Sequence, residues 1–263
     1  MGKMMKSRLL DATNGGSRLV ILPVDHGLAL GEVAGLEDPV DVAVTFAKQS
    51  SIDGTLCSAP VARRLAAAGF PETALRVLTL DSALQGGDGR ILQVAVCPVS
   101  VAKDAGCDGV KVLMGWDADL AARGKVLTLV ADAVHSGHEH GLPVIAEPVS
   151  AGAIERVDQS ELERRELEAA RIAIEVGADI IKMKIWPTAR FERFVQRCPV
   201  PVVALGGGLS GQRADVIDSI KRGLDMGLTG VFVGRNVWQR PRPEALELMQ
   251  EVCDLVHAGS AGA

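Results

Sequence analysis

Two lysines stand two residues apart in one apolar segment, Asp179-Ile-Ile-Lys-Met-Lys-Ile-Trp186. In an extended strand, residues two apart share a face, so Lys182 and Lys184 are expected to point together into the interior of the fold. A lysine in apolar surroundings and close to a second cation loses its proton more readily and becomes a nucleophilic amine. Such an amine condenses with a ketone to a Schiff base, which serves as an electron sink for C–C bond cleavage. The alternative is a lysine that snorkels from a strand end or only contacts a phosphate electrostatically.

Charged residues also occur within or directly after three other apolar segments. Lys111 lies within the first, Glu147 is the last residue of the second, and Asp25 and His26 follow the third. If these segments are parallel strands of one barrel, their carboxyl ends meet at one face and bring the charged groups together with Lys182. A single charged strand end is commonplace, whereas four that converge favour a catalytic site.

A phosphate site is indicated further along the chain. Gly206, Gly207 and Gly208 follow one apolar segment, and Gly234 and Arg235 follow the next. Glycines let backbone N–H groups approach an anion, and an arginine can bind a phosphate through two hydrogen bonds. Many barrels bind phosphate at this place, so the pattern predicts a phosphorylated ligand more firmly than it predicts a reaction class.

Three histidines, His135, His138 and His140, resemble a metal cluster by their spacing. They fall at the end of an expected helix that leads into a strand, which is the face of a barrel that serves stability, so we expect no metal site there. The chain has no tyrosine. Proton transfer must therefore use Asp, Glu, Lys or His side chains.

Eight short apolar segments carry these residues, each followed by a helical stretch such as Pro39–Gln49. Most are apolar throughout rather than alternating, as expected of parallel strands covered on both faces. Eightfold strand–helix alternation predicts an α/β fold, a single (β/α)₈ TIM barrel spanning residues 1–263. Residues 1–17 are expected to be an N-terminal extension, Gln85–Val96 an extended excursion, and residues 258–263 a frayed tail. The expected strands are Leu19–Val24, Gly54–Cys57, Arg76–Leu80, Gly109–Met114, Pro143–Glu147, Asp179–Met183, Val200–Leu205 and Gly230–Val233.

The composition limits the classes of partner that the protein is expected to bind. Its net charge is −5, so no general attraction to nucleic acid or to a membrane surface is expected. No apolar run is long enough for a membrane span, and the N-terminus lacks the features of a signal peptide. Five cysteines without a CxxC pair argue against a disulfide framework and favour a reducing, cytoplasmic location.

Several motifs, in the same order along the chain, resemble the class I aldolase superfamily, which includes archaeal-type fructose-bisphosphate aldolases, tagatose-bisphosphate aldolases and sulfofructose-phosphate aldolase. Val24-Asp-His-Gly27 is similar to the archaeal-type opening, and Gly177-Ala-Asp-Ile-Ile-Lys182 resembles the Schiff-base strand of all these groups. Ile145-Ala-Glu-Pro148 and Val233-Gly-Arg-Asn-Val-Trp238 look more like the tagatose and sulfofructose branch. The resemblance covers roughly residues 18–240.

This resemblance implies that Lys182 carries the imine, and that Lys111 and Glu147 assist the proton transfers. Archaeal-type members use a tyrosine as proton donor, which this chain lacks. We therefore expect Glu147 to replace it, with His26 as the rival, and Asp25 to act on the hydroxyl whose collapse breaks the C–C bond.

The expected function is cleavage or formation of a C–C bond in a phosphorylated ketose, releasing dihydroxyacetone phosphate, without a metal or organic cofactor. Lys184 is expected to assist Lys182 or to contact the substrate, and the protein is expected to be a homo-oligomer. One alternative is a transaldolase-like synthase that uses the same imine. The other is a flavin- or sugar-phosphate-binding barrel without aldolase chemistry.

Overall fold

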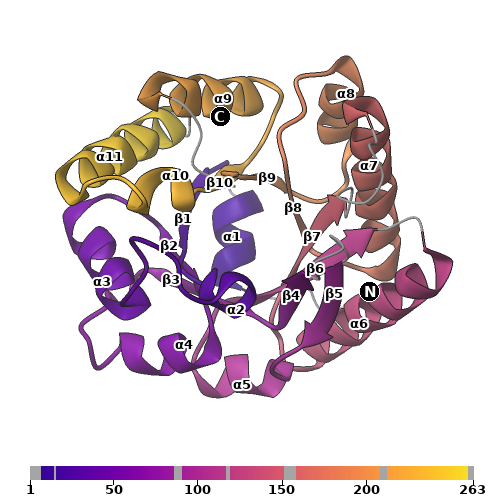
Figure 1. Ribbon diagram of the computed structural model, residues 1–263, viewed down its shortest axis with the longest axis horizontal. Coiled ribbons are helices and arrows are strands. Elements are labelled where there is room, and N and C mark those ends of the chain that lie inside the picture. The colour runs from indigo at the N-terminus through magenta and orange to yellow at the C-terminus, as the bar shows by residue number, and fades with distance from the viewer. Residues whose placement is uncertain are drawn as a thin grey trace.

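The computed structural model describes residues 7–14, 16–85, 91–116, 119–150, 158–207 and 212–259. A closed parallel barrel occupies its centre, with the strand order β1-β10-β9-β8-β7-β6-β3-β2 (Figure 1). This confirms the predicted TIM barrel. The barrel strands are β1 (Leu19–Pro23), β2 (Gly54–Cys57), β3 (Leu75–Thr79), β6 (Gly109–Trp116), β7 (Val144–Ser150), β8 (Ile180–Met183), β9 (Val202–Leu205) and β10 (Gly230–Phe232).

The strands β6 and β7 continue beyond their predicted ends, Met114 and Glu147. They pair with each other from Val110↔Val144 to Trp116↔Ser150, and this continuous pairing holds their last residues in extended conformation. The site at the carboxyl ends therefore stands on two strands that reach further than the others.

Helices form a ring around the barrel (Figure 1). Those that begin at a side-chain cap include α3, where the Asp38 carboxylate accepts from the N–H groups of Val40 and Asp41. The described helices are α1 (Arg8–Asn14), α2 (Gly27–Leu30), α3 (Pro39–Gln49), α4 (Ala59–Leu65), α5 (Val99–Asp104), α6 (Leu120–Glu139), α7 (Gln159–Val176), α8 (Ala189–Arg197), α9 (Arg213–Asp225), α10 (Arg235–Trp238) and α11 (Arg242–Ala258). The last helix includes Ala258, the first residue of the predicted tail, whereas residues 260–263 lie outside the described residues.

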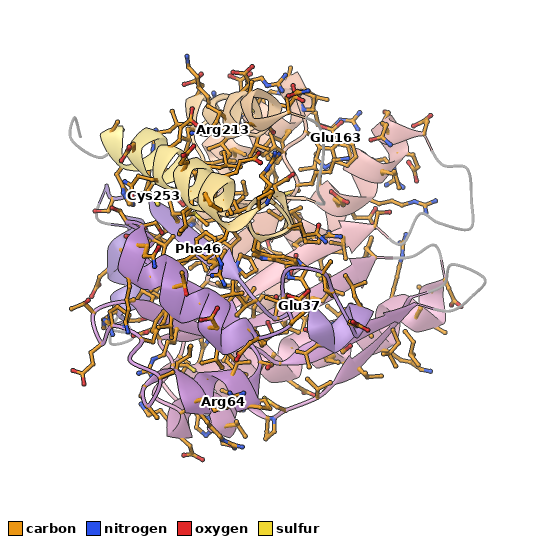
Figure 2. The ribbon with its side chains drawn as sticks, turned by 60° about the vertical axis from the view of Figure 1, so that its left-hand side comes forward. Glu37, Phe46, Arg64, Glu163, Arg213 and Cys253 are labelled. Carbon is orange, nitrogen blue, oxygen red and sulfur yellow. The ribbon has the colours of Figure 1, made fainter. Side chains whose placement is uncertain are left out.

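Alternate residues of each strand face two separate apolar layers. In β1, Val20 and Leu22 belong to the layer between strands and helices, together with Phe46 of α3 and Cys253 of α11 (Figure 2). The intervening residue Ile21 belongs to the layer inside the barrel. Because both faces are covered, the strands are apolar throughout, which explains the sequence pattern.

The first helix closes the amino-terminal end of the barrel. Leu9 of α1 is completely buried and belongs to the inner layer with Leu19, Ile145 and Ile180. Apolar side chains therefore fill the amino-terminal end of the barrel, and the polar residues gather at the carboxyl ends of the strands.

A hairpin is inserted between β3 and β6. It consists of β4 (Asp81–Gln85) and β5 (Ile91–Ala95), which pair antiparallel from Asp81↔Ala95 to Gln85↔Ile91. The predicted excursion is thus extended, but it begins at Asp81 rather than at Gln85. This difference places Asp81 directly at the end of β3, beside the site.

The described residues contain no helix with both the length and the hydropathy that a membrane span requires. All five cysteines are free thiols, and Cys57, Cys107 and Cys253 are buried.

Candidate active site

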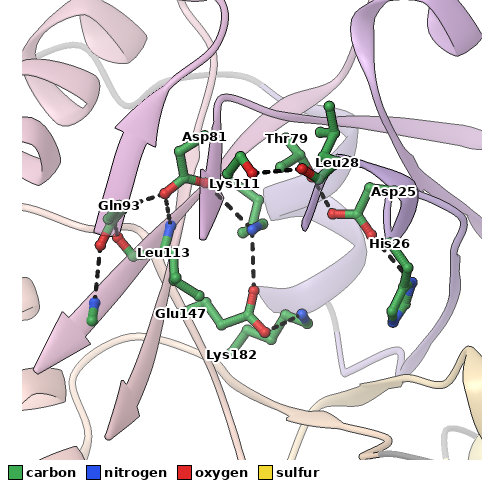
Figure 3. A network of polar contacts seen from close by, with 12 residues as sticks. Asp25, His26, Leu28, Thr79, Asp81, Gln93, Lys111, Leu113, Glu147 and Lys182 are labelled. Atoms are coloured by element: carbon green, nitrogen blue, oxygen red, sulfur yellow. Dashed lines mark hydrogen bonds and ion pairs between the residues drawn. The ribbon is translucent and has the colours of Figure 1, made fainter. Parts of the chain in front are cut away.

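A cavity of about 260 Å³ opens at the carboxyl ends of the strands, and charged side chains from several strands line it. Lys111 of β6, Glu147 of β7 and Lys182 of β8 face inward because each lies two residues after an inward-facing position of its strand. In β7 and β8 these preceding positions are the inner-layer residues Ile145 and Ile180. The structure therefore brings the three predicted residues into one pocket (Figure 3).

Glu147 lies between the two lysines. Its Oε1 accepts a hydrogen bond from Lys182 Nζ at 2.6 Å, and its Oε2 is 3.3 Å from Lys111 Nζ. The side chains of both lysines are 7 % exposed. The carboxylate thus joins two buried ammonium groups in one ion-pair network (Figure 3).

This network shifts the pKa of Glu147. Burial alone would raise the pKa of the carboxyl group, but the positive charges of Lys182 and Lys111 outweigh it and lower the pKa to about 2. Glu147 is therefore ionised at neutral pH, and it is poised to accept a proton rather than to give one in the free enzyme.

The two lysines differ in their carboxylate partners. Lys111 Nζ lies between Glu147 and Asp81, whose Oδ1 is 3.5 Å away. Burial opposes the charge on Lys111, but Asp81 and Glu147 together raise its pKa above the ordinary value, so it remains an ammonium ion. Lys182 has one carboxylate partner among the described residues, and its Nζ lies 5.5 Å from the centre of the Phe232 ring. The Lys111 ammonium thus lies between two carboxylates, whereas that of Lys182 contacts one in the described part of the chain.

Asp81 was not among the predicted site residues, although its side chain is 1 % exposed and lines the cavity. Its Oδ2 accepts from the Leu113 N–H at 2.8 Å and from Gln93 Nε2 at 2.7 Å. Gln93 belongs to β5, and its Oε1 accepts from the Gly115 N–H at 3.1 Å. The hairpin is thus fastened to the end of β6, where it holds Lys111.

Asp25 and His26 follow β1 and line the same cavity. Asp25 Oδ2 accepts from the Thr79 hydroxyl at 2.5 Å, while Asp25 Oδ1 lies 3.6 Å from His26 Nδ1. The His26 ring meets the Trp238 ring edge-on, with centroids 5.3 Å apart. These contacts hold Asp25 against the end of β3 and His26 against the Trp238 ring, which follows β10.

Burial lowers the pKa of the His26 ring below its ordinary value. The Asp25 carboxylate works against this shift, and the positive charges of Arg235 and Lys182 work with it. His26 is therefore neutral at pH 7, and its Nδ1 is buried without a hydrogen-bond partner among the described residues.

The residues of the predicted anion site line the cavity beside His26, whose Cε1 lies close to Gly234. Gly206, Gly207, Gly234 and Arg235 all line it, whereas Gly208 lies outside the described residues. Gly206 has to be glycine, since a Cβ there would lie 2.9 Å from Val233 Cα. Arg235 Nε is buried and has no hydrogen-bond partner in the described part of the chain. A buried guanidinium nitrogen without a partner, beside three glycines, is suited to binding an anion.

The expectation that Lys184 points into the barrel with Lys182 is wrong. The strand β8 ends at Met183, so the two-residue alternation stops before Lys184. Its side chain is exposed, with Nζ 4.0 Å from the centre of the Trp186 ring and 3.4 Å from Gln159 Oε1. The second lysine in contact with Glu147 is therefore Lys111, on the other carboxylate oxygen, and not Lys184.

The three histidines each engage a protein group near the end of α6. His138 Nε2 lies 3.0 Å from Asp179 Oδ2, His140 Nδ1 lies 2.8 Å from the Ser136 carbonyl, and His135 pairs with Glu139 at 3.3 Å. In the described segments, no group of three or more His, Cys, Asp or Glu side chains is arranged to hold a metal ion.

Comparison with known proteins shows which family the chain belongs to. Residues 19–240 match the family described as DeoC/LacD family aldolase. The chain belongs to this aldolase family. As a member, it is a class I aldolase-type enzyme, and the flavin-binding alternative has no support from the family.

Three similar proteins illustrate the range of the family. The 2-amino-3,7-dideoxy-D-threo-hept-6-ulosonate synthase of Halobacterium salinarum is 28 % identical, over 92 % of this chain and 88 % of the relative. The 3-hydroxy-5-phosphonooxypentane-2,4-dione thiolase of Yersinia pseudotuberculosis is 30 % identical, over 96 % and 82 %. A Schiff-base-forming fructose-1,6-bisphosphate aldolase is 25 % identical, with a TM-score of 0.76 and coverage of 91 % of this chain and 94 % of the other.

Proposed function

We propose that the protein cleaves or forms a C–C bond in a phosphorylated ketose through a Schiff base on Lys182. The observation that carries this proposal is the contact of 2.6 Å between Lys182 Nζ and Glu147, inside a cavity of about 260 Å³ that also contains Arg235. It provides a buried amine, a proton acceptor and an anion-binding side chain within one pocket.

In the first step, Lys182 passes a proton to Glu147 and attacks the ketone of the substrate. Once Lys182 has lost its charge, the main attraction that lowers the pKa of Glu147 is gone, so the carboxyl group can hold the proton. Glu147 then returns the proton to the carbinolamine hydroxyl, which leaves as water and gives the imine.

In the second step, the bond between the first and second carbons beyond the imine carbon breaks. Asp25, which accepts from Thr79, removes the proton of the substrate hydroxyl at the far carbon of this bond. The hydroxyl becomes an aldehyde, and the electron pair of the broken bond moves into the protonated imine to give an enamine. Protonation of the enamine carbon and hydrolysis then release the ketone fragment from Lys182.

Arg235 and the glycines beside it are proposed to bind the phosphate. Arg235 follows β10, which is separated from β8 by β9 alone, so the phosphate lies on the Lys182 side of the cavity. The phosphorylated fragment is therefore the one that carries the imine, and its product is dihydroxyacetone phosphate. All steps use side chains of the chain and require no metal or organic cofactor.

Borohydride trapping tests this proposal. Reduction in the presence of dihydroxyacetone phosphate should attach the reduced fragment to the peptide that contains Ile181–Lys184, and EDTA should leave the activity unchanged. The variant Lys182→Arg should lose the label, while Lys184→Arg, the matched control, should keep it because Lys184 lies outside the cavity. Labelling of another peptide, or loss of activity with EDTA, would rule out the proposal.

A second candidate is a synthase that transfers a fragment through the same imine. The observation that favours it is the similarity, over 92 % of this chain, to a protein named as a synthase. The two candidates differ in their products, since a synthase retains the fragment until a second carbonyl compound arrives, whereas an aldolase releases it to water.

A further inference from the structure

The cavity has two unlike ends. One end lies at the loops after β9 and β10, which contain the glycines and Arg235. The strand β3 lies halfway round the ring from β9, and the hairpin strand β4 follows it. Helix α2 lies beside β4 (Figure 1), so α2 and β4 form the wall opposite the predicted phosphate site.

The positive charges of the cavity are already matched, with one exception. Lys182 is paired with Glu147, and Lys111 with Glu147 and Asp81. Arg235 has no carboxylate paired with it among the described residues, and its buried Nε lacks a partner there. The described cavity thus offers one uncompensated cation, which suits one strongly charged group on the ligand.

The opposite wall has no cationic side chain in the part of the chain that the structure describes. It consists of Leu28, Ala29, Leu30, Ser82 and Ala83. The Ser82 hydroxyl donates to the Leu28 carbonyl oxygen at 2.6 Å. The nearby Thr79 hydroxyl is likewise committed, to Asp25 at 2.5 Å. Two carboxylates stand beside this wall and would repel a second anion: Asp81 directly precedes Ser82 in β4, and Asp25 is bonded to Thr79 at the end of β3.

We infer that the substrate carries a single phosphate, on the imine-forming fragment, and that the aldehyde fragment is short and uncharged. This inference rests on the proposed function, because the imine at Lys182 determines which end of the substrate faces the α2–β4 wall. A ketose bisphosphate would place its second phosphate against Leu30 and Ala83, where no described side chain carries a positive charge to pair with it. The enzyme therefore takes ketose monophosphates, with the α2–β4 wall selecting against charge at the other end.

Condensation with matched acceptors tests the inference without knowledge of the stereochemistry. Dihydroxyacetone phosphate is the donor, and its consumption is measured with D-glyceraldehyde, lactaldehyde or D-glyceraldehyde 3-phosphate as acceptor. We expect kcat/KM for the uncharged aldehydes to exceed that for the phosphorylated one by about 100-fold, since the second phosphate would meet carboxylates and no described cation. An equal or higher value for the phosphorylated acceptor, or no consumption of any uncharged aldehyde, would overturn the inference.

Trapping separates this outcome from failure of the proposed function. Borohydride with the donor alone should label Lys182 whatever the acceptor preference. Labelling together with a preference for D-glyceraldehyde 3-phosphate would overturn the inference and leave the aldolase proposal standing. Absence of both labelling and consumption would overturn both.

A variant adds a second readout. Leu30 is 52 % exposed and lines the cavity, so Leu30→Arg places a cation on the wall without disturbing the core. It should raise kcat/KM for the phosphorylated acceptor relative to D-glyceraldehyde by about tenfold. Leu92→Arg is the matched control, because Leu92 is 58 % exposed on β5 and does not line the cavity. An unchanged ratio in Leu30→Arg would count against the inference.

Discussion

Lys182 Nζ and Glu147 Oε1 lie 2.6 Å apart, although 35 residues separate them in the chain. The contact arises because β7 and β8 are neighbours in the barrel, with Ala146 opposite Ile181, so that the next residue of each strand faces inward. A proton can pass between these two groups without any rearrangement of the backbone.

The variant Glu147→Gln isolates this proton transfer. It keeps the size of the side chain and much of its hydrogen bonding but removes the titratable group. We expect kcat to fall by roughly 10²–10⁴, the usual contribution of general acid–base catalysis, with a much smaller change in KM. Steady-state kinetics of the cleavage reaction measure both values.

His26 provides the counter-test. It is neutral at pH 7 and lines the same cavity, so it could also carry protons. If Glu147→Gln keeps nearly the wild-type rate and His26→Asn loses it, the proton shuttle is His26.

The pH dependence of stability should report the Glu147 ion pairs. A carboxyl group whose pKa is lower in the folded than in the unfolded chain stabilises the fold above its unfolded pKa, and this contribution is lost as the pH falls. For Glu147 the window runs from about 4.5 down to about 2. Urea unfolding of wild type and Glu147→Gln should therefore show a steeper loss of stability in this window for wild type. Parallel curves would mean that the ion pairs do not lower the pKa of Glu147.

Arg235→Ala should weaken phosphate binding. Loss of a hydrogen bond to a charged group costs about 1.5–3 kcal/mol, and we expect KM for the phosphorylated substrate to rise correspondingly. Arg242→Ala is a suitable control, because Arg242 pairs with Asp41 on the surface and does not line the cavity. Equal KM values in wild type and Arg235→Ala would place the anion site elsewhere.

Asp81→Asn tests whether the hairpin positions Lys111. The substitution removes the charge that, with Glu147, holds the Lys111 ammonium, while an amide oxygen can still accept from the Leu113 N–H. A small displacement of a catalytic group is costly, so we expect kcat to fall by about 10- to 100-fold with little change in KM. A wild-type rate would show that Glu147 alone suffices to hold Lys111.

Leu9→Ala tests the closure of the barrel by α1. Leu9 is completely buried in the inner layer, and truncation of such a leucine costs about 2–5 kcal/mol of unfolding free energy. Leu120→Ala, at a position that is 82 % exposed, should change stability by no more than about 0.5 kcal/mol. Chemical denaturation monitored by circular dichroism compares the two, and equal stabilities would contradict the packing role of α1.

The sequence was sufficient to predict the barrel strands because parallel strands covered on both faces leave apolar runs that are easily recognised. It also predicted that Lys111, Glu147 and Lys182 would converge, since inward positions follow from the two-residue alternation.

The positions of two residues, Lys184 and Asp81, were not predicted correctly. Both depend on the residue at which a strand ends, which a sequence pattern locates poorly. Lys184 was predicted to face inward because the alternation was extended one residue pair too far, past the end of β8 at Met183. Asp81 was missed because it follows β3 at the start of an inserted hairpin, and its partner Lys111 lies 30 residues away. An acidic residue directly after an apolar strand was the available signal.

The hydrogen bond from Trp238 Nε1 to the Pro23 carbonyl oxygen, 3.0 Å long, joins residues 215 positions apart. It spans the pairing of β1 with β10, which closes the ring and brings Asp25 and His26, which follow β1, into one cavity with Arg235, which follows β10. A chain that has formed only β6, β7 and β8 would already contain the Lys111–Glu147–Lys182 network but would lack these three groups. Contacts of such long sequence separation are slow to form. We therefore expect enzymatic activity to recover during refolding only as the barrel closes, later than the gain of secondary structure.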